Sequence, residues 1–111
     1  MSAQNWTVVG APADLPDGRA TTREVDGVTV MVVRSGHRVF AVADRCTHQG
    51  ASLSRGPLRI TDALAAVTCP AHGSGFRLDD GRVLRGPATR AVAAYDVRVE
   101  DGVVEVRPRV E

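Results

Sequence analysis

One stretch, residues 46 to 76, constrains this chain more than any other, because it holds both cysteines and two of the three histidines. Cys46 and His48 form a Cys-x-His pair, and Cys69 and His72 form a Cys-x-x-His pair. Thiolate and imidazole are ligands that iron and zinc accept in proteins. Each segment supplies only two such ligands, so neither can hold a metal alone. The sequence therefore predicts a metal centre assembled between two loops.

The residues around the two pairs also form a pattern, with glycine and leucine after the first pair and Cys-Pro-x-His-Gly-Ser-x-Phe at the second. This pattern resembles the cluster-binding signature of Rieske iron–sulfur proteins. The positions that carry the resemblance are Cys46, His48, Gly50, Leu53, Gly56, Cys69, Pro70, His72, Gly73, Ser74 and Phe76. The segment between the pairs is longer than the family pattern leads us to expect. We place the surplus in residues 58 to 66, where it leaves the ligands unaffected.

The resemblance implies a ligand set. In Rieske proteins two histidines replace two cysteines on one iron of a [2Fe–2S] cluster. Carried over, Cys46 and Cys69 hold one iron, and His48 and His72 hold the other. Two ferric ions, two sulfides and two thiolates sum to zero charge, so an incoming electron meets a neutral centre. Rieske centres have potentials of roughly −150 to +300 mV, against about −400 mV for plant-type ferredoxins.

Two other interpretations of the four residues remain. They could be ordinary core cysteines and hydrogen-bonded histidines, although the tight pattern inside glycine-rich loops disfavours this. They could also hold a structural zinc ion, since two cysteines and two histidines suit tetrahedral zinc. Zinc fingers, however, usually pair cysteine with cysteine and histidine with histidine. We expect one [2Fe–2S] cluster.

The length of 111 residues predicts a single domain, 1–111, with cluster-binding loops at about 44–56 and 68–78. The first residues have neither a basic segment nor a continuous apolar stretch, so no signal peptide is predicted. No run reaches the ~18 apolar residues of a transmembrane helix. With an intact start at Met1 and both cysteines bound to the cluster, we expect a cytoplasmic protein without a membrane partner.

The charge is nearly balanced, with fourteen basic residues, all arginine, against thirteen acidic ones. A net charge of +1 gives no reason to expect nucleic-acid binding. Four arginines lie in or beside the predicted loops: Arg45, Arg55, Arg77 and Arg85. They could form a positive rim that docks an acidic partner, or they could be solvated surface residues.

The local pattern consists of short apolar or β-branched runs separated by turn residues, which predicts an all-β fold. The runs are WTVV, VTVMVV, VFAVA, LAAVT, YDVRV and VVEV. Asp26-Gly27 is typical of a two-residue hairpin, and similar turns are predicted at Ser35-Gly36, Asp80-Gly81 and Asp101-Gly102. We expect a small antiparallel, Rieske-like sandwich or barrel that carries a two-loop cluster-binding subdomain.

Three local predictions follow. Trp6 and Val8 should face the core and pair the N-terminal segment into a sheet. His37 should be solvated at a turn, which leaves no histidine for a mononuclear 2-His-1-carboxylate iron site. Residues 58 to 66 should form either a helical turn capped by Thr61 or Asp62, or a segment that runs into the strand ending at Thr68.

Comparison within the resembled family narrows the type. Ala51 and Ala71 occupy the places where respiratory and photosynthetic Rieske proteins carry two disulfide-bonded cysteines. The chain is more similar to the ferredoxins that serve aromatic-ring dioxygenases. Ser74 matches a serine that donates to a cluster sulfide in high-potential members, whereas Phe76 replaces their tyrosine. Residues 86–88, Gly-Pro-Ala, resemble the proline loop that covers the cluster.

These observations predict a soluble one-electron carrier without catalytic residues of its own. It would take electrons from a flavin-dependent reductase and pass them to a terminal oxygenase. A small subunit of a nitrite reductase or another reductase complex is the alternative within the same chemistry. A zinc-stabilised interaction module is the alternative from another class.

Overall fold

The computed structural model describes residues 6–109, which form ten short strands and two 3-10 turns. In chain order the elements are β1 (Thr7–Gly10), η1 (Pro12–Asp14), β2 (Ala20–Val25), β3 (Val28–Ser35), β4 (Arg38–Ala43), η2 (Leu53–Arg55), β5 (Leu58–Ile60), β6 (Ala65–Thr68), β7 (Gly75–Arg77), β8 (Val83–Arg85), β9 (Tyr95–Glu100) and β10 (Val103–Pro108). The predicted all-β class is confirmed. Within residues 6–109, no helix is long and apolar enough to cross a membrane.

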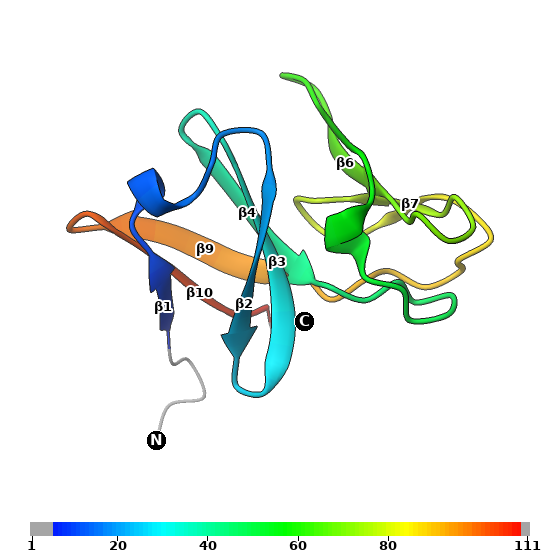
Figure 1. Cartoon of the computed structure of the whole chain (residues 1–111), viewed down its shortest axis with the longest axis horizontal. Helices are drawn as coiled ribbons and strands as arrows, with labels where there is room; N and C mark the ends of the chain where they lie inside the picture. The colour runs from blue at the N-terminus through cyan, green and yellow to red at the C-terminus, as the bar shows by residue number, and fades with distance from the viewer. Residues whose placement is uncertain (1–5, 110–111) are drawn as a thin grey trace.

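Three antiparallel sheets make up the molecule, in the orders β1-β10-β9, β2-β3-β4 and β5-β6-β7-β8. Figure 1 shows the first two sheets together on one side, and the third sheet with its long loops on the other. We call residues 6–43 and 94–109 the base, and residues 44–93 the loop subdomain. The chain leaves and re-enters the base at one place, where the Ala43 N–H donates to the Ala93 carbonyl at 2.9 Å.

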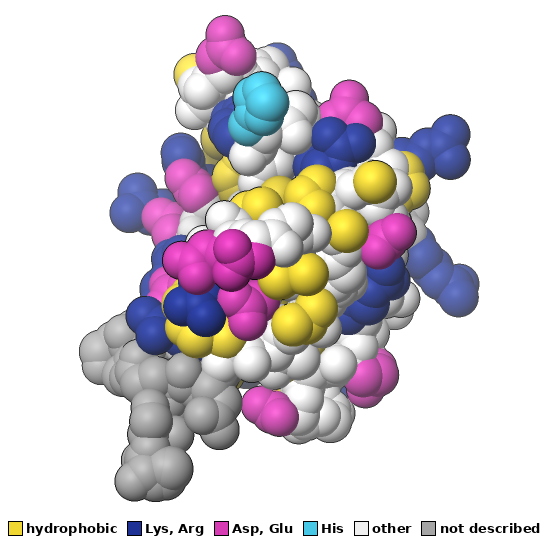
Figure 2. All heavy atoms as spheres, turned by 90° about the vertical axis from the view of Figure 1, so that its left-hand side faces the viewer, with side chains coloured by type: hydrophobic (Ala, Val, Ile, Leu, Met, Phe, Trp, Pro, Cys, Tyr) yellow, Lys and Arg dark blue, Asp and Glu magenta, His cyan; other side chains and the backbone are white. Residues whose placement is uncertain are grey.

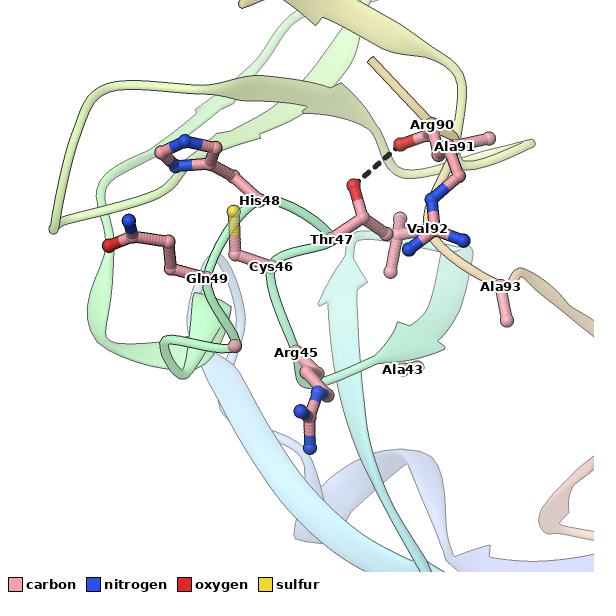
Figure 3. A pocket seen from close by; sticks show the side chains of 11 residues that line it. Ala43, Arg45, Cys46, Thr47, His48, Gln49, Arg90, Ala91, Val92 and Ala93 are labelled. Atoms are coloured by element: carbon pink, nitrogen blue, oxygen red, sulfur yellow. Dashed lines mark hydrogen bonds between the residues drawn. The ribbon is translucent and has the colours of Figure 1, made fainter. Parts of the chain in front are cut away.

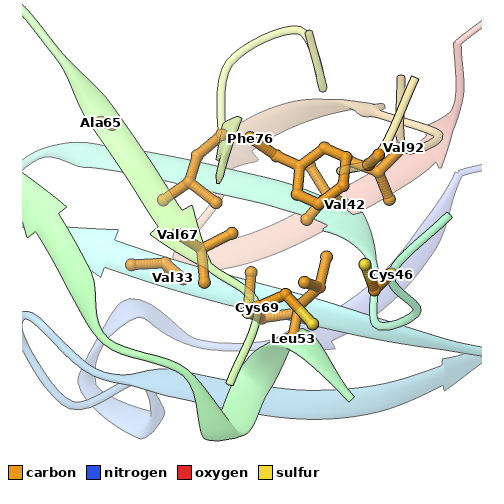
Figure 4. Packing of buried hydrophobic residues seen from close by; sticks show 12 residues of the cluster. Val33, Val42, Cys46, Leu53, Ala65, Val67, Cys69, Phe76 and Val92 are labelled. Atoms are coloured by element: carbon orange, nitrogen blue, oxygen red, sulfur yellow. The ribbon is translucent and has the colours of Figure 1, made fainter. Parts of the chain in front are cut away.

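Strand β3 explains how the two parts are joined. Its central residues, 30 to 33, are all fully buried, and successive side chains point to opposite faces of a strand. Val30 and Val32 pack in the core of the base. Met31 and Val33 pack in a second core with residues of the loop subdomain. Figure 4 shows this second core, where Val33 and Val42 of the base lie among side chains of both loops.

The hairpin turns follow the sequence where both turn residues tolerate positive φ. Asp26 and Gly27 have φ of 51° and 80°, and the Asp101-Gly102 turn has the same form, so both predictions are confirmed. The turn predicted at Ser35-Gly36 is displaced by one residue, because Ser35 still pairs with Arg38 in the ladder. His37 is exposed in that turn, as predicted.

The Asp80-Gly81 turn is wider than predicted. It begins at Leu78, and the Gly81 N–H donates to the Arg77 carbonyl at 3.0 Å. A Cβ atom at Gly81 would lie 1.9 Å from the Val92 carbonyl oxygen. Glycine is therefore required here by the close approach of two backbone segments.

The N-terminal segment joins a sheet as predicted, through pairing of β1 with β10. Its predicted orientation is wrong. Val9 is 4% exposed and packs in the core of the base, whereas Val8 is 57% exposed. The guanidinium groups of Arg98 and Arg107 instead lie over the Trp6 ring, at 4.2 and 4.4 Å from its centroid. Cation–π contacts, and not core packing, cover this indole.

Residues 58 to 68 form the β5–β6 hairpin, so the strand interpretation is correct and the helical turn is wrong. Thr61 nevertheless organises the turn. Its Oγ1 accepts hydrogen bonds from the N–H groups of Ala63 and Leu64 at 3.3 and 3.0 Å. A threonine hydroxyl that serves as a helix cap elsewhere closes a hairpin here.

Candidate metal centre

The first predicted loop is closed by its own backbone. The Cys46 N–H donates to the Ala51 carbonyl at 2.8 Å, and the Cys46 carbonyl accepts from the Gly50 N–H at 2.8 Å. Gly50 has a φ of 79°, which L side chains rarely adopt. This tight turn presents His48 at its outer end.

The second loop repeats the same pattern. The Cys69 N–H donates to the Ser74 carbonyl at 2.7 Å, and the Cys69 carbonyl accepts from the Gly73 N–H at 3.1 Å. Gly73 has a φ of 83°. In both loops a cysteine thus bonds to residues four and five positions ahead. The two cysteines are held by equivalent turns, which explains why glycine recurs at the same distance after each.

The four predicted ligands meet at one end of the molecule. Cys46 and Cys69 are free thiols, only 2% and 3% exposed, and they belong to the second core. His48 and His72 are exposed. Their ring centroids lie 5.3 Å apart, with the ring planes at 89°. The sulfur atoms are therefore sheltered inside the protein, while the two imidazoles lie side by side at the surface.

This donor set suits a binuclear group better than a single ion. Structural zinc requires four donors around one ion, whereas a Rieske cluster takes two donors on each of two irons. Two buried thiols and two adjacent imidazoles fit the second requirement.

Close contact between the loops explains another motif position. A Cβ atom at Gly56 would lie 1.8 Å from the Thr68 carbonyl oxygen and 3.1 Å from Cδ of Pro70. Only glycine allows η2 of the first loop to approach the strand that leads into the second. Gly56 thereby sets the separation of the two loops.

Ser74 belongs to the second loop, is completely buried and contacts the segment of residues 86–88. Its Oγ accepts a hydrogen bond from the Ala88 N–H at 2.9 Å. The hydroxyl hydrogen is not used in that bond and can donate elsewhere. The predicted proline loop therefore lies against the second loop, with Ala88 buried and Pro87 exposed.

Two contacts at the first loop were not predicted. Asp44 is 9% exposed, and its carboxylate accepts from the Ser54 N–H at 2.6 Å and from the Ser54 hydroxyl at 2.8 Å. This Asp44–Ser54 clamp joins the two ends of the loop. Thr47, between the predicted ligands, donates from its hydroxyl to the Arg90 carbonyl at 2.6 Å. Both contacts bridge residues far apart in sequence, so no local pattern indicates them.

A groove of about 640 Å³ lies beside His48, between the first loop and residues 90–93. Figure 3 shows that Arg45 and Arg90 both line it, and that the Thr47–Arg90 hydrogen bond crosses it. The guanidinium of Arg45 packs over Gly50, where an added Cβ would approach it to 3.3 Å. The groove that His48 borders is therefore lined by two arginines, of which Arg45 points away from the imidazole (Figure 3).

Several known proteins are similar to this chain over most of its length. Residues 5–96 match the Rieske [2Fe-2S] domain family. The 3-phenylpropionate/cinnamic acid dioxygenase ferredoxin subunit of Escherichia coli (strain K12) is 38% identical over 90 residues, which are 81% of each chain. The ferredoxin of carbazole 1,9a-dioxygenase from Nocardioides aromaticivorans IC177 superposes with a TM-score of 0.82 at 33% identity, over 93% of this chain and 99% of that one.

A structure described as an NADH-dependent nitrite reductase small subunit from Mycobacterium tuberculosis is similar as well. It has a TM-score of 0.83 at 33% identity and covers 97% of both chains. The chain belongs to the Rieske [2Fe–2S] family and carries one [2Fe–2S] cluster. Within that family it is a ferredoxin-type electron carrier, which transfers electrons and does not itself catalyse a reaction.

Proposed function

We propose that Cys46 and Cys69 bind one iron of the cluster and that His48 and His72 bind the other. The whole chain, 1–111, would act as one soluble, cytoplasmic domain that receives electrons from a flavin-dependent reductase and delivers them to a terminal oxygenase. The burial of both thiols and the exposure of both imidazoles carry this assignment.

The cluster supplies a site that gains and loses one electron. The chain's own residues decide where that electron enters and leaves. The two buried cysteines keep water from the sulfur-ligated side, where the second core surrounds them. The imidazoles of His48 and His72 form the exposed edge, so a partner that touches them comes closest to the cluster.

The oxygenase assignment rests on the ferredoxin relatives. One similar structure is a complex of oxygenase and ferredoxin in carbazole 1,9a-dioxygenase, with 32% identity and a TM-score of 0.84. The nitrite reductase alternative is supported by the comparably similar small subunit from Mycobacterium tuberculosis. Both functions use the same cluster and differ only in the partner.

Anaerobic mixing experiments separate these functions. Holoprotein is first bleached by NADH and a flavin-dependent reductase, and then mixed with either a terminal oxygenase or a nitrite reductase large subunit, each from the source organism. Recovery of the oxidised spectrum with the oxygenase alone supports the proposal. Recovery with the nitrite reductase alone supports the alternative, and a colourless protein with one bound zinc rejects both.

A further inference from the structure

Charge is distributed unevenly between the two parts of the molecule. The loop subdomain has seven arginines and four acidic residues, whereas the described base has seven arginines and eight acidic residues. Their formal charges are therefore +3 and −1. Figure 2 shows the side of the base that carries the β9–β10 hairpin, where acidic and basic side chains are intermixed.

The acidic residues of the loop subdomain are largely committed to other contacts. Asp44 is buried in its clamp with Ser54. Asp79 accepts two hydrogen bonds from Arg77, both at 2.9 Å. Asp80 lies 3.6 Å from Arg82. Asp62 is exposed, but it lies in the turn of the β5–β6 hairpin, at the end away from the metal loops.

Four arginines remain exposed around the metal loops, and we call them the arginine ring: Arg45, Arg55, Arg85 and Arg90. Among the described residues, none of the four has an acidic oxygen within 4.0 Å of its guanidinium. Arg77, one of the four arginines named in the sequence analysis, is not part of the arginine ring, because it forms an ion pair with Asp79. Arg90 takes its place.

The four members of the arginine ring all lie in the loop subdomain, close in the chain or in the fold to the loops that carry the two imidazoles. Arg45 and Arg90 line the groove beside His48. Arg55 precedes Gly56, which packs against the strand end and the proline of the second loop. Arg85 pairs with Gly75, directly after that loop.

We propose that the arginine ring is a docking surface for a redox-partner protein that carries Asp and Glu side chains around its own electron-transfer site. This inference rests on the proposed function and specifies the partner's chemistry. Opposite potentials on two protein faces steer them together and raise the association rate. Because these cations belong to the loop subdomain, which also carries the two exposed imidazoles, steering would bring the partner to the end of the molecule where the electron leaves. The overall charge of +1 conceals this, since it averages both parts.

The electrostatic potential near the exposed imidazoles can be measured first with small charged oxidants. Holoprotein reduced with dithionite and desalted is mixed in a stopped-flow instrument with hexacyanoferrate(III), a trianion, or with tris(phenanthroline)cobalt(III), a trication. Each oxidant takes one electron from the reduced protein. The rate with the trianion should fall as ionic strength rises from about 20 to about 300 mM, and the rate with the trication should rise. The cluster spectrum is recorded before mixing, so failure of the proposed function is seen separately.

Variants in which arginines are replaced by glutamine test whether the positive electrostatic potential comes from the arginine ring. The double variant Arg85→Gln/Arg90→Gln should react about three- to tenfold more slowly with hexacyanoferrate(III) at low salt, with a flatter salt dependence. Arg19→Gln is the control, because Arg19 is exposed on the base and makes no side-chain ion pair within the described chain. It should leave the rate unchanged. If the double variant and Arg19→Gln changed the rate equally, or if the rate did not depend on salt, the proposed role of the arginine ring would be overturned.

The protein partner is then tested with the oxygenase or reductase subunit that exchanges electrons with the holoprotein. The bimolecular rate should fall with salt, and it should fall in the double variant but not in Arg19→Gln. A rate insensitive to both would overturn docking through the arginine ring. Binding of a duplex DNA fragment at about 150 mM salt, lost in the double variant, would reassign the surface to nucleic acid.

Discussion

Ser74 and Ala88 are joined by a hydrogen bond in which the Ala88 N–H donates to the Ser74 hydroxyl oxygen at 2.9 Å. This contact fixes the orientation of the hydroxyl and leaves its hydrogen for a second acceptor. If the acceptor is a cluster sulfide, the bond strengthens on reduction, because the cluster then carries an additional negative charge.

Ser74→Ala should therefore lower the reduction potential by roughly 50 to 100 mV. Hydrogen bonds to charged groups contribute about 1.5 to 3 kcal/mol, and only the difference between the oxidation states shifts the potential. For one electron, about 59 mV corresponds to a tenfold change in equilibrium constant. Protein-film voltammetry measures the shift, with Ser52→Ala as a control because Ser52 is exposed. An unchanged potential with an intact visible spectrum would leave Ser74 a purely structural role.

The ligand assignment predicts the metal content of two histidine variants. Protein purified without oxygen should contain two iron and two labile sulfide per chain. His48→Ala should abolish the normal cluster spectrum, because one iron loses a ligand. His37→Ala should retain the full spectrum, since His37 is exposed in the turn between β3 and β4. Iron and sulfide analysis decides the matter, and a His48→Ala protein with an unaltered cluster would refute the assignment.

The Asp44–Ser54 clamp should stabilise the first loop. Ser54→Ala removes the hydroxyl that donates to Asp44 Oδ2 and leaves that buried oxygen without a partner. The expected loss is about 1 to 3 kcal/mol in the free energy of unfolding. Chemical denaturation followed by circular dichroism measures it.

The clamp should also slow cluster loss, because it closes the loop that holds Cys46 and His48. Release of iron to a chelator should be faster in Ser54→Ala than in the wild type. Ser52→Ala, which changes a neighbouring exposed serine, should release iron at the wild-type rate. Indistinguishable rates in all three proteins would show that the clamp does not guard the site.

Asp96 should make the free energy of unfolding depend on pH in the acidic range. Burial alone would raise the pKa of Asp96, but the hydrogen bonds and charges of Arg107 and Arg109 outweigh burial and hold this pKa below its ordinary value of 3.8. A carboxyl with a depressed pKa in the folded state stabilises the protein above its unfolded pKa. That contribution is lost as the pH falls from about 5 through the folded-state pKa.

Arg109→Gln should therefore lower the unfolding free energy at pH 7 by about 0.5 kcal/mol, as expected for a partly exposed ion pair. The difference from the wild type should shrink toward pH 3. Thermal unfolding across this pH range measures it, with Arg19→Gln as the control. A difference that stays constant with pH would assign the effect of Arg109 to packing.

The sequence predicted the all-β class and two of the four hairpin turns correctly, because the signals for these features are local. Asp26-Gly27 and Asp101-Gly102 carry their turn geometry in two adjacent residues. The Trp6 and Val8 error has an equally local cause. Val8 and Val9 are both apolar, so alternation does not tell which of them faces the core.

Contacts that depend on the folded arrangement of the chain could not be predicted from sequence patterns. The Asp44–Ser54 clamp spans ten residues and depends on how the first loop closes. The arginine ring depends on which arginines find carboxylates in the folded chain. Arg77 is neutralised by a residue two positions away, while Arg90 reaches the site only because the segment after β8 returns past Thr47.

The alternation along β3 has a mechanical consequence. Neighbouring residues such as Met31 and Val32 belong to different cores, so a single peptide unit connects the packing of the base with that of the loop subdomain. The base and the loop subdomain are therefore joined through a shared strand, β3, whose two faces pack in the two cores. If the chain delivers electrons as proposed, the position of the two imidazoles relative to the base should therefore stay fixed when a partner docks.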